Sequence, residues 1–297
     1  MRQTYKMEKP PEPAMNWRDY EELILANWDE LLNKNPAPTE KAIQHFLEKH
    51  PSMVPGAFNL IGAESGHHPW LRGLISQPVL PSFDHHKPDF MWLSKNSATV
   101  EPVLIEIEAP DKHWWTKSGQ PTAQLTQALD QIAEWKAWFA EPHNIQEFKD
   151  IYGLTREDWR KMNFRPSYLL IFGRRTEANR TPNLTAKRSH LAPDDVKIRT
   201  YDSLQPNPKA SQLVCMKIEN DHGQYIFKAL SVPATLVWKP AFASDRALLS
   251  GLDHAIDSNE QIPHKRKNFL KQRLHYWSEW SNNQNGQMIC YTSGDEE

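Results

Sequence analysis

The segment Val103–Glu108, with the sequence VLIEIE, constrains the fold of this 297-residue chain more than any other stretch. Its apolar residues and the following Pro110 predict a buried strand that ends near Glu108. Successive side chains of a strand point to opposite faces, so Glu106 and Glu108 share one face. Because unpaired buried carboxylates are costly, this face needs a cation, a network of donors or water.

A further carboxylate precedes the neighbouring strand predicted at Asp89–Leu93, and a turn at residues 95–96 makes the two strands a hairpin. Hairpin pairing places Asp89 beside Glu106. Converging carboxylates are the hard-oxygen ligands that Mg²⁺ prefers. The alternative is a solvated strand end that carries two glutamates. The apolar run and the flanking Pro88-Asp89 and Ala109-Pro110 pairs favour the metal interpretation.

The remaining pattern predicts an α/β fold with an irregular stretch at residues 52–78. Helices are expected at residues 16–33, 40–50, 122–140, 155–161, 184–190 and 264–280, and strands at 168–172, 197–201, 213–218 and 224–230. We expect three parts: an N-terminal lead and helix (1–35), a core (36–208), and an appendage (209–297) with a β-hairpin and a basic helix.

Composition excludes several classes of protein. The net charge of −2 does not suit a protein that coats DNA or membranes, and the two cysteines form no Cys-x-x-Cys pair. No signal-like leader or apolar run of membrane-spanning length is visible, so we expect a cytoplasmic protein without a membrane partner. The 11 glycines include no phosphate-loop motif.

At this point the sequence resembles a known family. Pro88-Asp89 followed by Glu106-x-Glu108 resembles the PD-(D/E)XK nuclease signature. Together with the helix sequence QALDQIAEW (residues 127–135) and a strand that ends in Gly-Arg-Arg (173–175), residues 38–205 resemble the Shedu anti-phage nuclease domain. The resemblance implies a restriction-endonuclease-like core with a mixed central sheet flanked by helices. It also implies a DNA endonuclease that cuts foreign or phage DNA in prokaryotic phage defence. The implied cofactor is Mg²⁺, with Mn²⁺ as a substitute, and the implied assembly is a homo-oligomer.

Residue by residue, the resemblance assigns metal binding to Asp89 and Glu106 and adds Glu40 and Gln131 as helical site residues. Glu108 stands where the family has lysine, so it would bind metal or accept a proton from the attacking water. Lys112 and Lys117, which follow this strand, are candidates to supply the missing charge. By spacing alone, Gln131 is also a helix-surface glutamine, and Glu40 also suits the macrodipole of its helix.

Two basic segments predict phosphate contacts. Residues 151–190 contain nine Lys/Arg and three Asp/Glu, and residues 261–275 contain five Lys/Arg and no acid. The DNA-contact candidates are Arg174, Arg175, Arg165 and Lys112, followed by Arg156, Arg160, Lys265, Arg266 and Lys267. A solvated face or a subunit interface is the alternative.

Some aromatic residues and histidines have two interpretations. Trp114 and Trp115 are either stacking groups for nucleotides or, preferably, loop anchors. The adjacent histidine pairs at residues 67–68 and 85–86 are interpreted as loop residues in preference to metal ligands.

Besides an endonuclease, the chain fits a catalytically weak or inactive module that senses DNA or nucleotides, or a structural protein without a nucleic-acid partner.

Overall fold

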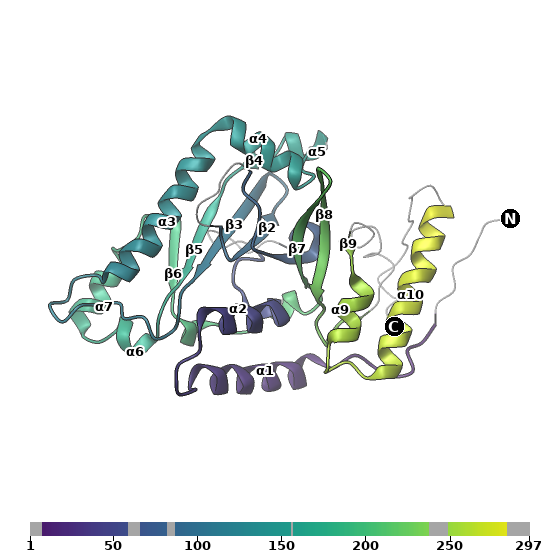
Figure 1. Cartoon of the computed structure of the whole chain (residues 1–297), viewed down its shortest axis with the longest axis horizontal. Helices are drawn as coiled ribbons and strands as arrows, with labels where there is room; N and C mark the ends of the chain where they lie inside the picture. The colour runs from purple at the N-terminus through teal and green to yellow at the C-terminus, as the bar shows by residue number, and fades with distance from the viewer. Residues whose placement is uncertain (1–7, 59–65, 82–86, 156, 238–248, 284–297) are drawn as a thin grey trace.

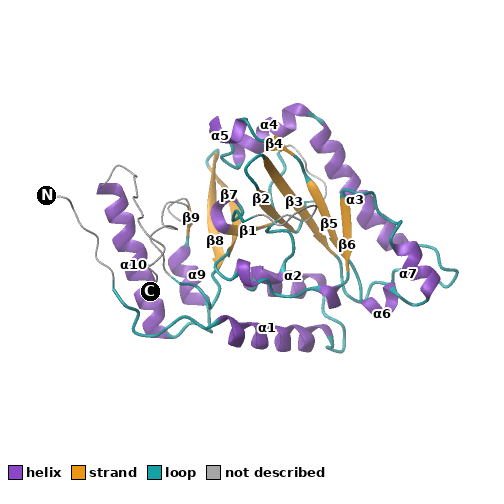
Figure 2. Ribbon diagram, turned by 180° about the vertical axis from the view of Figure 1, so that it is seen from behind, coloured by secondary structure: helices purple, strands orange, loops and turns teal. Residues whose placement is uncertain are grey.

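The computed structural model describes residues 8–58, 66–81, 87–155, 157–237 and 249–283. Within them, nine strands form one mixed sheet in the order β6-β5-β3-β2-β1-β7-β8-β9, with β4 paired to β3. Helices α1 and α2 lie together along one end of the sheet, and α3 runs along the border formed by β5 and β6 (Figures 1 and 2). The expected α/β architecture, a mixed sheet flanked by helices, is therefore confirmed.

The two N-terminal helices form where periodicity and capping predict them. Helix α1 (Trp17–Leu32) begins after Asn16, whose side chain accepts from the Asp19 amide. Helix α2 (Glu40–Lys49) begins after Thr39, which caps it in the same way. The apolar stripes of both helices are buried in the core.

The predicted central hairpin is confirmed. Strand β2 (Phe90–Lys95) pairs antiparallel with β3 (Thr99–Ile107), with Phe90 opposite Ile105. Strand β5 (Ser167–Ile171) runs parallel to β3, and β6 (Val196–Arg199) runs parallel to β5. Because β3 is buried along almost its whole length, Glu106 near its end and Glu108 just after it are also buried.

Strand β1 (Gly73–Ser76) lies within residues 52–78, which the sequence pattern predicts to be irregular. Four residues are too few to show a period, so the strand is defined by its neighbours β2 and β7. A Cβ atom on Gly73 would lie 3.0 Å from the Val214 carbonyl oxygen and would displace the flexible end of the Met216 side chain, so glycine suits the close approach of β7. Tertiary packing therefore determines this strand.

The C-terminal hairpin continues the same sheet. Strands β7 (Val214–Asp221) and β8 (Gln224–Ser231) pair antiparallel, and β7 lies parallel to β1. The sheet therefore crosses the expected boundary at residue 208. Helix α10 (His264–Asn283) packs against α9 (Leu252–Ser258). The amide of Met15 donates to the Ala234 carbonyl at 3.2 Å, so the N-terminal lead contacts the appendage.

The other elements are short or connect these parts. They are α3 (Ala123–Ala140), α4 (Pro142–Ile151), α5 (Glu157–Arg160), β4 (Asn163–Phe164), α6 (Arg175–Ala178), α7 (Pro182–Arg188), β9 (Leu249–Ser250) and the 3₁₀ turns η1 (Pro51–Met53), η2 (Trp70–Arg72), η3 (Tyr201–Ser203) and η4 (Pro208–Ala210). The sequence pattern did not predict α4, α6, α9, β4 and β9. None of the helices described is long and apolar enough to span a membrane.

Candidate active site

Asp89 lies directly beside the end of β3. Its amide donates to the Ile105 carbonyl at 3.0 Å, and its Oδ2 accepts from the Ile107 amide at 2.9 Å. Since Phe90 pairs with Ile105, the register brings Asp89 opposite Glu106. The hairpin thus places the two carboxylates side by side, as its pattern predicts.

Glu106 and Glu108 are buried, with only 8% and 7% of their surfaces exposed. Oε2 of Glu106 is buried and has no hydrogen-bond partner in the described chain. A buried acceptor without a donor costs free energy, and a bound cation or a proton would remove that cost.

The carboxylates of the hairpin raise one another's pKa values. The pKa of Asp89 rises to about 7, chiefly because of burial, although the Ile107 amide opposes this, and the charges of Glu40, Glu108 and Glu48 raise it further. Burial and then the charge of Asp89 hold the pKa of Glu106 well above its ordinary value. The pair is thus a site of concentrated negative potential.

Two residues from outside the hairpin reach the same site. Glu40 lies in the first turn of α2, and burial followed by the charge of Glu108 raises its pKa, while Lys112 lowers it. The ammonium group of Lys112 binds the carboxylate of Glu108. A turn in which the Lys112 amide donates to the Ala109 carbonyl at 3.1 Å brings the lysine back to the strand end.

Sequence reasoning missed two residues of this site. The hydroxyl of Tyr201, a fully buried residue, donates to the Glu108 carbonyl at 2.5 Å. Glu48 contributes charge near Asp89 and accepts from Ser76 Oγ at 2.6 Å. Glu48 lies about two helical turns from Glu40 on α2, a spacing that could have suggested it. No local signal marks Tyr201.

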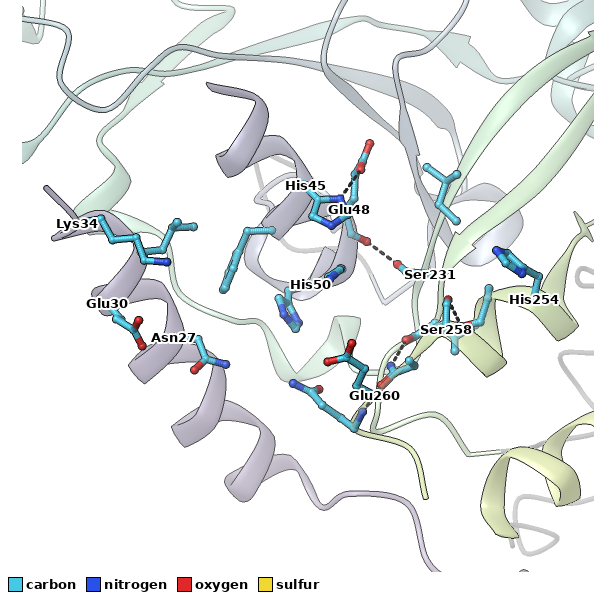
Figure 3. Close-up of a pocket in the computed structure, with 18 residues that line it drawn as sticks. Asn27, Glu30, Lys34, His45, Glu48, His50, Ser231, His254, Ser258 and Glu260 are labelled. Carbon is cyan, nitrogen blue, oxygen red and sulfur yellow. Dashed lines mark hydrogen bonds and ion pairs between the residues drawn. The ribbon is translucent and has the colours of Figure 1, made fainter. Parts of the chain in front are cut away.

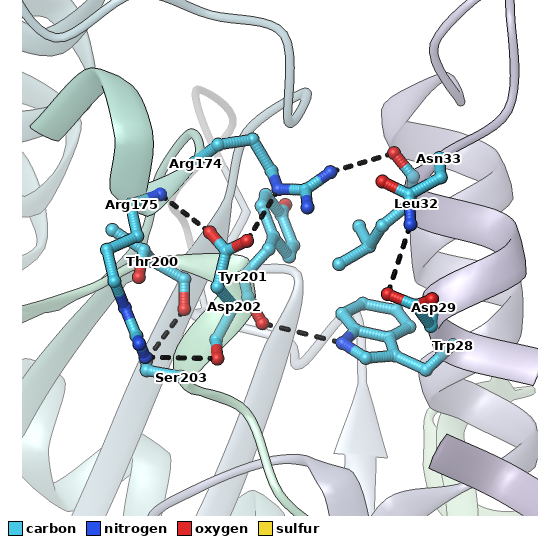
Figure 4. Close-up of polar contacts among 10 residues, drawn as sticks. All are labelled: Trp28, Asp29, Leu32, Asn33, Arg174, Arg175, Thr200, Tyr201, Asp202 and Ser203. Atoms are coloured by element: carbon cyan, nitrogen blue, oxygen red, sulfur yellow. Dashed lines mark hydrogen bonds and ion pairs between the residues drawn. The ribbon is translucent and has the colours of Figure 1, made fainter. Parts of the chain in front are cut away.

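Arg174 and Arg175 follow β5 at the same end of the sheet, and both make hydrogen bonds within the protein (Figure 4). Arg174 Nε donates to Asp202 Oδ1 at 2.9 Å, and its Nη1 donates to the Leu32 carbonyl at 2.9 Å. The Arg175 amide donates to Asp202 Oδ2 at 2.6 Å, and its Nη2 to the Asp202 carbonyl at 3.2 Å. Arg174 therefore joins η3 to α1 through the Asp202 carboxylate and the Leu32 carbonyl.

The acid residues of this site lie within the part of the chain that a family model matches. Residues 37–205 match the family described as "Shedu protein SduA, C-terminal", and this match spans more than half of the chain. The chain belongs to the Shedu family. No curated protein matches the sequence. Membership of the Shedu family suggests a role in anti-phage defence.

The Shedu-matched region contains two expected site residues that the structure does not join to the acids. Arg165 follows β4, and its amide donates to the Val100 carbonyl at 3.0 Å, at the opposite end of β3. Glu106 lies six residue steps along the strand from Val100, a distance of about 20 Å. Gln131 is half-buried on α3 and its Oε1 is buried without a hydrogen-bond partner, but no contact found among the described residues joins it to the acids.

Two tryptophans and the basic helix are packed into the protein. Trp114 and Trp115 are buried, which confirms them as loop anchors.

The phosphate contact expected of Arg266 is wrong: this side chain is fully buried, and it donates to the carbonyls of Glu12 at 2.8 Å and Leu236 at 2.6 Å. Charge counting missed the burial of Arg266 because it does not show which face of a helix is buried.

Of the two histidine pairs, residues 85–86 lie outside the described chain. His67 is an exposed loop residue, and its Nε2 lies 3.3 Å from Ser97 Oγ.

The acid pair of Asp89 and Glu106 supplies carboxylate oxygens, the kind of ligand that Mg²⁺ binds. Nowhere in the described ranges do three or more His, Cys, Asp or Glu side chains form a complete metal cage. Glu108, the expected third ligand, is instead bound by Lys112. However, Mg²⁺ is commonly held by one or two carboxylates together with waters and substrate phosphates. Asp89 and Glu106, with its unpartnered Oε2, fit that pattern.

The raised pKa of Asp89 predicts a pH dependence of stability. Its folded-state pKa of about 7 exceeds its ordinary value of 3.8, so the folded protein keeps a proton that the unfolded chain loses as the pH rises between these values. Without metal, stability should therefore fall over this interval, by at most about 1.4 kcal/mol per pH unit for this proton. The measurement is urea unfolding in a chelator at several pH values. Asp89→Asn should flatten the profile, and an identical profile for Asp89→Asn would contradict the prediction.

Proposed function

We propose that this protein is a Mg²⁺-dependent endodeoxyribonuclease of the PD-(D/E)XK type that cuts foreign DNA during anti-phage defence, as a homo-oligomer. The observation that supports this most strongly is the buried pair Asp89 and Glu106, in which Glu106 Oε2 lacks a partner. This pair lies within the Shedu match, at the end of the central strand.

Each residue of the site has a role in phosphodiester hydrolysis. Asp89 and Glu106 would hold Mg²⁺, which supplies positive charge next to the scissile phosphate and lowers the pKa of a water molecule. The Glu108 carboxylate would accept a proton from the attacking water. Lys112, which contacts Glu108, would place the positive charge that the motif otherwise provides at position 108. Tyr201 would orient the Glu108 backbone.

The test is a cleavage assay on the full chain. We expect hydrolysis of one or more of linear, supercoiled, nicked and single-stranded DNA with Mg²⁺ or Mn²⁺, and none in a chelator. Equal cleavage with and without metal would contradict the proposal.

The ion pair between Glu108 and Lys112 favours a second function, because it engages the carboxylate that was expected to be the third metal ligand. The chain would then be a nuclease-like module that senses DNA or nucleotides without cutting. DNA binding in the absence of cleavage of every DNA form in the same assay would support it.

Lys112→Met should lower the rate of DNA cleavage about 100-fold, since removal of a single group that stabilises developing charge commonly costs this much. Metal binding should persist, because Asp89 and Glu106 remain. The double variant Glu108→Lys, Lys112→Glu should recover part of the rate, because it returns the lysine to the motif position. Lys117→Met, a change of an exposed lysine in the same loop, is the control. Unchanged cleavage by Lys112→Met would exclude this role.

A further inference from the structure

A pocket of about 650 Å³ opens between α1, α2, β8 and α9 (Figure 3). This volume falls within the range of small-molecule sites. Residues from α1, β8 and α9 form much of its wall and lie outside the Shedu match at 37–205. The pocket is therefore a feature that the family assignment does not explain.

Charged side chains without protein partners surround the pocket. Lys34, Lys49, Glu30 and Glu260 line it and are exposed, and their charged groups form no hydrogen bond or ion pair with the described residues. Asn27 and Glu30 on α1, and Lys34 just after it, lie on one side of the pocket, and His50 and Glu260 lie across from them (Figure 3). A ligand that matches this wall needs an anionic group for the lysines and donor groups for the carboxylates.

The same wall contains an aromatic surface. Phe46 is half-buried and lines the pocket, with its ring centroid 5.0 Å from that of Trp28 and 4.6 Å from that of His50. Leu31 and Leu230 extend the apolar surface. Because its neighbours hold the Phe46 ring in place, a planar group can pack against it at little cost in side-chain entropy.

We propose that this pocket binds a nucleoside phosphate, with the phosphate at Lys34 and Lys49 and the base against Phe46. The side chains of Asn27, Glu30 and other polar wall residues would hydrogen-bond the base edge and the ribose hydroxyls. Inorganic phosphate would leave the aromatic surface and the carboxylates unused, and a polyamine would leave the two lysines without a partner. A nucleotide satisfies all three features together.

Glu48 places this pocket next to the acid centre. It lines the pocket, its Oε1 accepts from Ser76 Oγ at 2.6 Å, and its charge raises the pKa of Asp89. Ser76 pairs with Phe90, the residue after Asp89. Glu48 thus belongs to the wall of the pocket and also acts on the acid centre, although neither site requires the other to bind its ligand.

The test is isothermal titration calorimetry of the full chain with AMP, GMP, CMP, UMP and ATP, inorganic phosphate and spermine as probes. A chelator in every titration prevents metal-bridged binding at the acid centre. We expect at least one nucleotide to bind and inorganic phosphate to bind at least tenfold more weakly. Lys34→Ala and Lys49→Ala should each weaken nucleotide binding about tenfold, the effect of losing one charge-assisted hydrogen bond. Lys41→Ala, on the same helix but outside the pocket, and Asp89→Asn should not weaken it.

Three results would overturn the proposal. They are no binding heat with any nucleotide at millimolar concentration, phosphate or spermine binding as tightly as the nucleotides, and unchanged affinity in the double variant Lys34→Ala, Lys49→Ala. Loss of nucleotide binding in Asp89→Asn would locate the site at the acid centre and would also overturn it. A chain that binds a nucleotide here but cleaves no DNA would refute the nuclease function alone.

Discussion

Glu106→Gln is expected to lower Mg²⁺-dependent DNA cleavage about 1,000-fold. The substitution keeps the volume of the side chain but removes the charge that would hold the cation beside Asp89. Charge stabilisation by a catalytic metal contributes several kcal/mol, and each 1.36 kcal/mol corresponds to a factor of ten in rate. Initial rates on the best DNA substrate, with parent and variant at matched folded concentrations, measure the effect.

A matched control lies on the same strand. Glu101 is a buried glutamate of β3, 7% exposed, and its Oε1 accepts from Ser167 Oγ at 2.5 Å. Glu101→Gln retains an acceptor for Ser167 and should leave the rate within a few-fold of the parent. The melting temperature of Glu106→Gln without metal should also rise, because burial and then the charges of Asp89 and Glu108 disfavour the charged form of Glu106. Equal cleavage by Glu106→Gln and the parent would show that the acid pair is not the active site.

Arg266→Met is expected to lower the free energy of unfolding by about 3 kcal/mol. The fully buried guanidinium of Arg266 holds together three segments that are distant in sequence: α10, the Glu12 carbonyl of the N-terminal lead and the Leu236 carbonyl. Hydrogen bonds from a charged group contribute about 1.5 to 3 kcal/mol each, and removal of the donor leaves the acceptor carbonyls without it. Urea unfolding followed by circular dichroism measures the change.

The neighbouring residue provides the control for this prediction. Lys265 is exposed on the same helix, so Lys265→Met should change stability by less than about 0.5 kcal/mol. DNA affinity should be the same for Arg266→Met and the parent where both are folded, because the guanidinium faces the protein interior. A selective loss of DNA affinity with unchanged stability would instead support the phosphate contact first expected of Arg266.

The local pattern was sufficient for most of the regular structure. Alternation and a short turn predict the hairpin of β2 and β3, and helix caps at Asn16 and Thr39 predict where α1 and α2 begin. The hairpin alone also predicts Asp89 beside Glu106, because the pairing of adjacent strands follows from residues close in sequence. Strand β1 and helix α9 were missed because they are short and depend on partners far along the chain.

By itself, the sequence determined the acid-bearing strand, its hairpin partner and the residue types that converge there. Only the tertiary structure decided that Lys112 binds Glu108, that Tyr201 holds the Glu108 backbone, and that α2 brings Glu40 to the site. It also decided that Arg174 and Arg266 serve contacts within the protein. The physical reason is the range of each interaction. Side-chain alternation follows from the backbone of a few residues, whereas the partner of a charged group depends on which distant segments pack around it.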